Sequence, residues 1–415
     1  MPTSDPAASP DKMPSCLKPL MFQSFVCTMA LMTFAALAGP IGRSLGLAPW
    51  HMGIAVTAGG IAWILTARTW GSASDRHGRR PVLLGGLGGF AASYAGLCLI
   101  TALALEDGMP ALAALAGLVA GRTFAGAFFA AVPTAGAAMI ADHVAPARRA
   151  AAMGTLGMAS ASAMVIGPAV AGLIAPYDLV LPLLVAAALP VVAFATSWWL
   201  LPRTEKPQRP AAPRPPPHLT DRRLRRPVIL AFVGMVAVAT AQMVVGFYAI
   251  DRLGLAPQEG ARVAGIALTC VGVALMLTQA TVRVLRRPPD VLVRVGAAVA
   301  GLAFMGAVFA VTPLLLYLCY FLSAIGMGLL WPSISAMAAN AVEPHEQGSA
   351  AGTVSAAQGL GTVVGPLLAT VIYTVDETAP YVLIALLLLA LVPGGARRTA
   401  AAARETITEA PTPGG

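Results

Sequence analysis

A short cluster of charged residues between two apolar runs is the first feature of this sequence that could do chemistry. Residues 71–86 read GSASDRHGRRPVLLGG. The apolar runs on both sides are long enough to cross a membrane, so the cluster must lie in a very short turn at the membrane surface. There an ion-pair network is partly desolvated and stabilises by more than the ~0–1 kcal/mol of an exposed pair. The cluster therefore predicts ion pairing by Asp75, Arg76, Arg79 and Arg80, flanked by Gly71 and Gly78.

Arg122 is the one charged side chain well inside an apolar run. An arginine in the hydrocarbon core costs at least ~2.5 kcal/mol on insertion scales, so it needs a partner or a wet cavity. Two functional interpretations are an anion site for a substrate and a positive field that tunes a nearby proton carrier. The structural alternative is hydrogen bonding to backbone carbonyls of neighbouring helices. Because intramembrane ionisable groups are functional by default, we expect Arg122 to serve substrate binding or coupling.

The composition places these residues in a helical membrane protein. Hydrophobic residues make up 57% of the 415 residues and charged residues 11%, whereas a soluble domain carries about 25% charged residues. The apolar runs are unbroken and lack the alternation of barrel strands. We therefore predict an all-α membrane protein. Its twelve expected transmembrane helices cover residues 20–42, 50–70, 82–104, 110–141, 151–175, 178–201, 227–250, 260–282, 291–312, 314–340, 348–373 and 379–395.

The placement of positive charge supports this topology. With both termini in the cytoplasm, the inner segments contain 23 of the 27 Lys and Arg residues, and the outer side has only Arg43, Arg252 and Arg262. This bias follows the positive-inside rule, so the net charge of +9 reflects topology and not nucleic-acid binding. The first span is full length and predicts a retained helix rather than a signal peptide. The excess of arginine over lysine suits a bacterium, so we expect the inner (plasma) membrane with both termini cytoplasmic.

Two copies of one unit explain the order of the spans. Residues 137–174 and 335–372 match at 14 of 38 positions with a constant offset of 198 residues. Repeats of this size are typical of secondary transporters, which bind substrate near the midplane between the repeats. A proline-rich stretch between the copies predicts a cytoplasmic linker. The expected domains are a cytoplasmic tail (1–19), a six-helix bundle (20–201), the Pro/Arg-rich linker (202–226), a second six-helix bundle (227–395) and a C-terminal tail (396–415).

Three motifs carry a resemblance to a known family. GSASDRHGRRPVLL (71–84) resembles the loop between the second and third helices of the major facilitator superfamily, and GRTFAGAFFAA, from Gly121, resembles its fourth-helix signature. IGPAVAG (166–172) resembles the fifth-helix Gly-Pro signature of the drug/proton antiporter, or efflux, branch. The resemblance covers essentially the whole chain. It implies two pseudo-symmetric six-helix bundles and transport by alternating access.

The resemblance also implies a cytoplasmic latch that breaks in each transport cycle. In it Asp75 faces the N-terminus of the eleventh helix, where the helix dipole stabilises a carboxylate by roughly 0.3–1 kcal/mol, and Arg79 bonds the opposing half. Topological anchoring alone accounts for the arginines but not for Asp75. For Asp142, at the end of the fourth helix, a solvated helix end is an equal alternative. The expected latch residues are Gly71, Asp75, Arg76, Gly78, Arg79, Arg80 and Asp142.

Paired glycine and proline residues predict kinks at equivalent places in the two halves. Proline removes a backbone hydrogen bond from its helix, and small neighbours let helices approach closely. Two equivalent kinks would let the halves rock against each other; the alternative is a pair of tolerated kinks without a gating role. The expected kink and gating residues are Gly167, Pro168, Gly172, Gly365 and Pro366.

Polar residues are sparse in the spans, and no Asp or Glu lies within a span away from its ends; Asp178, Asp251 and Glu259 lie at the predicted outer ends. An apolar lining with few hydrogen-bonding groups suits a small amphiphilic substrate. Members of the efflux branch often carry a carboxylate in the first or fourth helix, and its absence here leaves Asp142, Asp251 and His51 as candidate proton carriers. The predicted substrate or coupling residues are Arg122, Gln242, Tyr248 and Gln358.

The sequence shows no catalytic constellation, metal-ligand spacing or nucleotide-binding loop, so we expect no enzyme activity, no metal and no cofactor. The most consistent function is proton-coupled efflux of a small amphiphilic compound, either a drug or a self-made metabolite such as a siderophore. The expected partners are this small molecule, a proton and the lipid bilayer, without nucleic acid, and one chain suffices. The alternatives are an importer of an organic anion in the same fold and a non-transporting membrane sensor.

Overall fold

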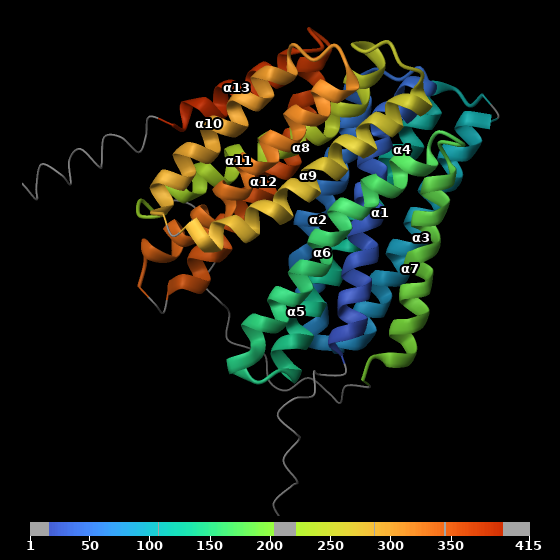
Figure 1. Cartoon of the computed structure of the whole chain (residues 1–415). Helices are drawn as coiled ribbons and strands as arrows, with labels where there is room; N and C mark the ends of the chain where they lie inside the picture. The colour runs from blue at the N-terminus through green and yellow to red at the C-terminus, as the bar shows by residue number, and fades with distance from the viewer. Residues whose placement is uncertain (1–15, 107, 203–220, 286, 344–345, 393–415) are drawn as a thin grey trace, which may run out of the picture.

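The computed structural model describes residues 16–106, 108–202, 221–285, 287–343 and 346–392. In these ranges the chain forms helices and no strands. Figure 1 shows a first half, coloured blue to green, beside a second half, coloured yellow to red. The helices of the first half are α1 (Leu17–Ser44), α2 (Pro49–His77), α3 (Arg79–Glu106), α4 (Ala111–Phe129), α5 (Ala131–His143), α6 (Pro146–Ile174) and α7 (Leu181–Leu200). Those of the second half are α8 (Arg225–Asp251), α9 (Pro257–Leu285), α10 (Pro289–Ala307), α11 (Pro313–Asn340), α12 (Gln347–Tyr373) and α13 (Ala379–Ala390).

The predicted all-α membrane fold is confirmed. Within the described residues, 11 helical segments are long and apolar enough to cross a membrane, and α13 is a further apolar helix of 12 residues. The twelfth predicted span ran to residue 395, and its last residues lie outside the described ranges. The predicted linker and both predicted tails also lie largely outside them.

The fourth predicted span, 110–141, is divided in the structure between α4 and α5. Pro133 has no N–H to donate to the carbonyl of Phe129, four residues earlier, and α4 ends at Phe129. The two helices together still form one membrane-length segment, Ala111–His143. The break therefore changes the helix count without changing the topology.

The internal repeat appears as matching contacts in the two halves. Thr33 of α1 donates a hydrogen bond to the carbonyl of Gly167 in α6, at 3.3 Å. Thr240 of α8 donates to the carbonyl of Gly365 in α12, at 3.4 Å. Both threonines are buried, so each bond satisfies a hydroxyl that lipid could not. The two copies thus pack their equivalent helix pairs, α1–α6 and α8–α12, in the same way.

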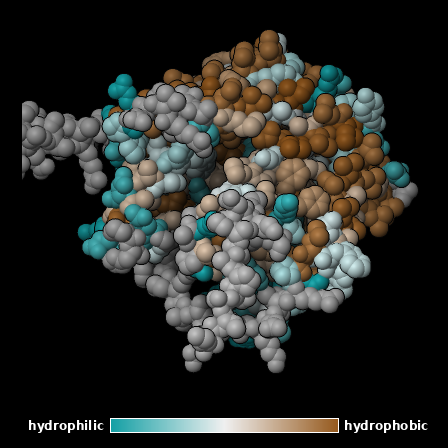
Figure 2. Space-filling view, turned by 60° about the horizontal axis from the view of Figure 1, so that its bottom comes forward, coloured by the Kyte–Doolittle hydropathy of each residue, from teal (hydrophilic) through white to brown (hydrophobic). Residues whose placement is uncertain are grey.

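The surface matches a hydrocarbon environment. Large apolar side chains that a soluble protein would bury are widely exposed, among them Leu65 (69%), Phe124 (58%) and Leu302 (62%). Figure 2 shows hydrophobic residues over a broad part of the visible surface. Exposed apolar surface on this scale marks contact with another apolar phase, which supports the membrane assignment.

The halves meet through helix pairs α1–α8, α2–α12 and α6–α9. We call the end of the molecule that carries Ser44, Asp251 and Tyr373 the outer end, following the charge bias of the sequence. The opposite end, which carries His77 and Arg225, is called the cytoplasmic end. The contacts between the halves differ sharply between these two ends, and this difference determines the geometry of the candidate site.

Candidate functional site

A cavity of about 300 Å³ lies where α6 of the first half faces the second half. Its walls are mostly aliphatic, methionine and aromatic side chains, including Met164, Phe304 and Trp331. None of the residues that line it is charged. A concave, largely apolar site of this size fits a small organic ligand. The lining comprises Ala161, Met164, Val165, Met235, Val238, Ala241, Gln242, Leu268, Val271, Gly272, Leu275, Phe304, Tyr320, Ser323, Ala324, Met327, Trp331 and Gln358.

Two glutamines supply the free polar groups of this cavity. Gln242 and Gln358, both predicted from the sequence, lie in its wall and are partly exposed to it. Among the described residues neither side-chain amide has a hydrogen-bond partner. By contrast, Tyr320 donates to the carbonyl of Ala241 at 2.7 Å and lies 2.8 Å from the hydroxyl of Tyr381. The glutamine amides are therefore available to a ligand, and each offers donors and an acceptor without charge.

The structure places two other predicted residues away from the cavity. The hydroxyl of Tyr248 donates to the carbonyl of Ala307 at 2.9 Å, so this buried side chain ties α8 to the end of α10. Arg122 is 7% exposed and lies 4.9 Å from the ring centroid of Phe34, within the first half. Its Nε and Nη1 have no hydrogen-bond partner. Neither residue lines the cavity, which argues against direct substrate contact by either.

An ion pair joins the two halves at the outer end. Arg43, at the end of α1, donates to Asp251, at the end of α8, with a separation of 2.5 Å. Tyr373 of α12 donates to the same carboxylate oxygen at 2.9 Å, and the Arg43 guanidinium lies over Phe247 at 5.5 Å. Sequence analysis named Asp251 only as a candidate proton carrier. The signal it missed is that α1 and α8, which are equivalent helices of the repeat, carry opposite charges at their C-terminal ends.

Toward this outer end, glycines bring the helix backbones of the two halves close together. A Cβ on Gly172 of α6 would lie 2.7 Å from the Cα of Gly265 in α9, and a Cβ on Gly39 of α1 would lie 2.5 Å from the backbone nitrogen of Phe247 in α8. These distances are too short for any side chain, so only glycine permits the approach. Gly172 was predicted as a gating residue, and the structure places it at a contact between the halves.

Four glycines of α6 and α12 nearer the cytoplasmic end have no close neighbour from the opposite half. A Cβ on Gly154 or Gly157 of α6, or on Gly352 or Gly359 of α12, would have no heavy atom within 4 Å. Gly154 and Gly352 are repeat-related, as are Gly167 and Gly365, which pack tightly against α1 and α8. The visible face in Figure 2, with the cytoplasmic end turned forward, shows a hollow near its centre. The molecule is therefore closed at the outer end and open toward the cytoplasmic end.

Three residues of the predicted latch pair with one another within the first half in this conformation. Arg79 pairs with Asp75 and, at 2.8 Å, with Asp142, and all three belong to the first half. The expectation that Arg79 bonds the opposing half is not met here, because the halves are apart at this end. Gly78, with φ of 94°, is the single residue between α2 and α3. A Cβ added to Gly71 would lie 3.5 Å from Thr134 of α5, so this position is not as tightly packed as the outer-end glycines.

Two arginines of the predicted latch point elsewhere. Arg80 donates to the carbonyl of Trp198 in α7 at 2.5 Å, and its guanidinium lies 5.6 Å from the Trp198 ring centroid. Arg76 is exposed on the last turn of α2. Arg79 therefore carries the ionic part of the network, and Arg80 belongs to the contact between α3 and α7.

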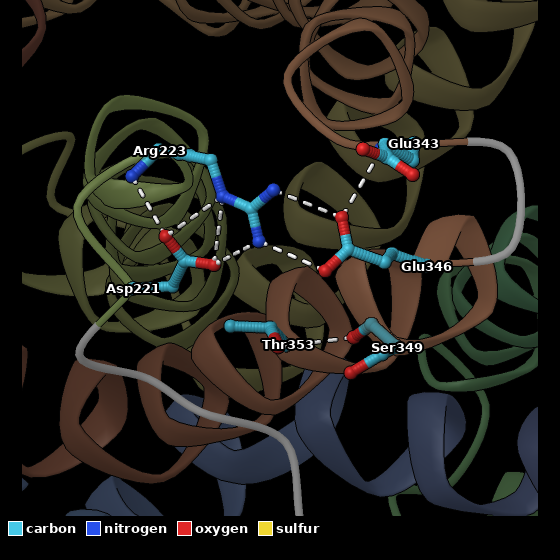
Figure 3. A network of polar contacts seen from close by, with 6 residues as sticks. All are labelled: Asp221, Arg223, Glu343, Glu346, Ser349 and Thr353. Atoms are coloured by element: carbon cyan, nitrogen blue, oxygen red, sulfur yellow. Dashed lines mark hydrogen bonds and ion pairs between the residues drawn. The ribbon is translucent and has the colours of Figure 1, made fainter.

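A comparable arginine network closes the cytoplasmic end of the second half (Figure 3). Arg223 pairs with Asp221 at 3.0 Å and with Glu346, just before α12, at 2.9 Å. Glu346 and then Asp221 raise the pKa of Arg223 above its ordinary value through hydrogen bonds, so the arginine stays charged. Sequence analysis missed this network because its partners are 123 residues apart in the chain. Each half thus holds one arginine between two carboxylates at the cytoplasmic end.

We predict that Asp251→Asn opens the outer end. The variant removes the ion pair with Arg43, and hydrogen bonds to charged groups are worth about 1.5–3 kcal/mol, so the outward-open population should rise roughly tenfold or more. The measurement is labelling of Met164→Cys from outside intact cells by a membrane-impermeant maleimide, with the five natural cysteines replaced. Asp178→Asn is the matched control, because Asp178 caps α7 within its own half. Equal labelling of wild type and Asp251→Asn would contradict the assignment.

We predict that Gly172→Ala forces α6 and α9 apart. Overpacking of this kind costs about 1–3 kcal/mol, and here it destabilises the state in which the outer end is closed. The same labelling of Met164→Cys should therefore become several-fold faster. Gly157→Ala, in the open part of the same helix, should leave labelling unchanged, since its Cβ meets nothing within 4 Å. Identical behaviour of the two alanine variants would show that the contact does not hold the outer end closed.

Comparison with known proteins agrees with this architecture. Tetracycline resistance protein, class C, from Escherichia coli is 28% identical over 344 residues, which cover 79% of this chain and 81% of the relative. Multidrug resistance protein 2 from Bacillus subtilis (strain 168) is 26% identical over 345 residues, covering 80% of this chain and 82% of the relative. These similarities agree with the efflux-branch resemblance of the sequence motifs.

Solved structures show the same fold at low sequence identity. A POT family transporter in complex with 5-aminolevulinic acid has a TM-score of 0.69 at 13% identity, over 91% of this chain and 95% of that chain. The human organic anion transporter MFSD10 has a TM-score of 0.61 at 18% identity, over 91% of this chain and 98% of that chain. Residues 20–313 and 261–411 match the family described as the Major Facilitator Superfamily. This chain belongs to the major facilitator superfamily.

Proposed function

We propose that this protein exports a small amphiphilic compound without net charge, taking it from the cytoplasmic side. The observation that carries the proposal is the uncharged cavity between the halves, with two unpaired glutamine amides in its wall. The cavity lies in a molecule closed at the outer end by Arg43 and Asp251. An exporter needs this state, closed at the outer end and open toward the cytoplasm, in order to bind its substrate from inside the cell.

The relatives support export over import. They include tetracycline and multidrug resistance proteins that align with about four-fifths of this chain. Resistance conferred by a membrane carrier requires that the compound leave the cell. A foreign drug is therefore the first substrate class to test, with a self-made metabolite second.

The lining of the cavity limits the charge of the substrate. Transfer of an unpaired charged group into an apolar cavity is costly, and no residue of the lining offers an opposite charge. Arg122, the expected partner of an anion, does not line the cavity. The geometry thus favours an uncharged drug or metabolite over a charged siderophore, and it gives no support to an importer of organic anions.

We further propose that the proton gradient drives export. Asp251 bridges the two halves at the outer end through its contacts with Arg43 and Tyr373. Asp251 therefore has the properties of a gate rather than of an inward proton carrier. Asp142, which is paired with Arg79, and His51, whose Nδ1 accepts from the Ala48 backbone at 3.1 Å, stay candidates for that role. We place the chain in a bacterial inner membrane, with both termini cytoplasmic and as a functional monomer.

We predict that Gln242→Ala and Gln358→Ala each weaken export. A lost hydrogen bond is worth about 0.5–1.5 kcal/mol, so apparent affinity should fall roughly two- to tenfold. The measurement is accumulation of a neutral fluorescent amphiphile in cells that lack their own efflux pumps and express the full chain. Gln279→Ala is the matched control, since Gln279 is exposed on α9 and does not line the cavity.

Each alternative gives a different result in this assay. Higher accumulation with the protein than without it would show import and overturn the proposal. Equal accumulation of every compound tested, with normal amounts of protein in the membrane, would leave the non-transporting sensor as the better reading. Lower accumulation that Gln242→Ala and Gln358→Ala leave untouched would place the binding site outside this cavity.

A further inference from the structure

We propose that the groove between α3 and α7, on the lipid-facing side of the first half, binds one anionic phospholipid with its phosphate on Arg80. Helices α3 and α7 lie side by side (Figure 1). At their cytoplasmic ends they enclose a cavity of about 560 Å³, separate from the cavity between the halves. Its lining is Arg80, Pro81, Leu84, Gly85, Gly88, Phe194 and Trp198.

The floor of the groove is shaped for a hydrocarbon chain. A Cβ on Gly85 would meet no heavy atom within 4 Å, so this position leaves open space beside the buried Leu84. Phe194 lies over Gly88, at 3.2 Å from where a Cβ would be. Both sides of the groove are therefore apolar, and lipid is the phase that surrounds this part of the helices.

Arg80 supplies the charge at the mouth of the groove. Its Nη2 donates to the carbonyl of Trp198 at 2.5 Å, and the guanidinium lies over the Trp198 ring. Its Nε is buried without a hydrogen-bond partner. No acidic residue in the described part of the chain pairs with Arg80, in contrast to Arg79, which holds two. A fixed, uncompensated guanidinium matches a phosphate, to which it donates more than one hydrogen bond.

The position of the groove selects the lipid. Trp198 is 51% exposed and Trp199 is 82% exposed, and tryptophans of this kind mark the headgroup level of a membrane. Negatively charged lipids give the cytoplasmic leaflet its surface potential. Because the lining holds an arginine and no carboxylate, it matches a headgroup with net negative charge and offers no partner for the ammonium of a zwitterionic one.

The test is native mass spectrometry of the full chain in mild detergent, titrated with phosphatidylglycerol of defined acyl length. We expect Arg80→Gln to bind the first lipid roughly tenfold more weakly than wild type, because a hydrogen bond to a charged group is lost. Gly85→Leu fills the groove and leaves Arg80 in place, so it should weaken binding as well. Arg68→Gln, an exposed arginine of α2 outside this groove, is the charge-matched control and should bind as wild type does.

Two competitors separate the possible sources of the phosphate. Phosphatidylethanolamine of the same acyl length should bind more weakly than phosphatidylglycerol, and inorganic phosphate should not displace the lipid. The proposal is overturned if Arg80→Gln binds phosphatidylglycerol as wild type does. It is equally overturned if Gly85→Leu has no effect, or if inorganic phosphate competes, which would indicate an ion site without an acyl groove.

Discussion

At the outer end, helices of the two halves approach so closely that a single added methyl group has no room between Gly172 and Gly265 or between Gly39 and Phe247. Close backbone packing of this kind is the main source of attraction between helices in lipid, where the hydrophobic effect is absent. The partly exposed Arg43–Asp251 pair adds an ionic contact between the halves, for which water can compete. Tight glycine contacts and one breakable ion pair together make the outer end a closed but reversible seal, and the open cytoplasmic end follows from it.

Charge is distributed so that the ligand cavity contains none of it. The ionic networks of Arg79 and Arg223 lie at the cytoplasmic end, each within its own half, and Asp251 lies at the outer end. Both arginines pair with carboxylates of their own half, so neither pair joins the two halves. The cavity between the halves is lined by uncharged residues alone, so the proposed amphiphilic substrate would meet no fixed charge there. Arg122 differs from these paired arginines. It is buried against Phe34, and its Nε and Nη1 have no hydrogen-bond partner.

Sequence reasoning was most successful where a local pattern has a direct physical meaning. Apolar length predicted the spans, and the repeat placed Gly167 and Gly365 at equivalent contacts. Two of the predicted binding residues, Gln242 and Gln358, do line the cavity, as expected for polar side chains on apolar spans at the contact between the halves. Arg43, Trp331 and the Arg223 network were missed, because pairing between distant segments is set by tertiary packing. Arg80 was assigned to the latch from its neighbours, yet its rotation on α3 turns it toward Trp198.

The measurement that tests the central claim most directly is transport in inverted membrane vesicles, in which the cytoplasmic face is exposed to the medium. A neutral fluorescent amphiphile is added together with an energy source that establishes a proton gradient. The account predicts that vesicles with this protein accumulate the compound, that a protonophore releases it, and that Gln242→Ala reduces the rate. Accumulation that is equal in vesicles without the protein, or that occurs only in right-side-out vesicles, would contradict it.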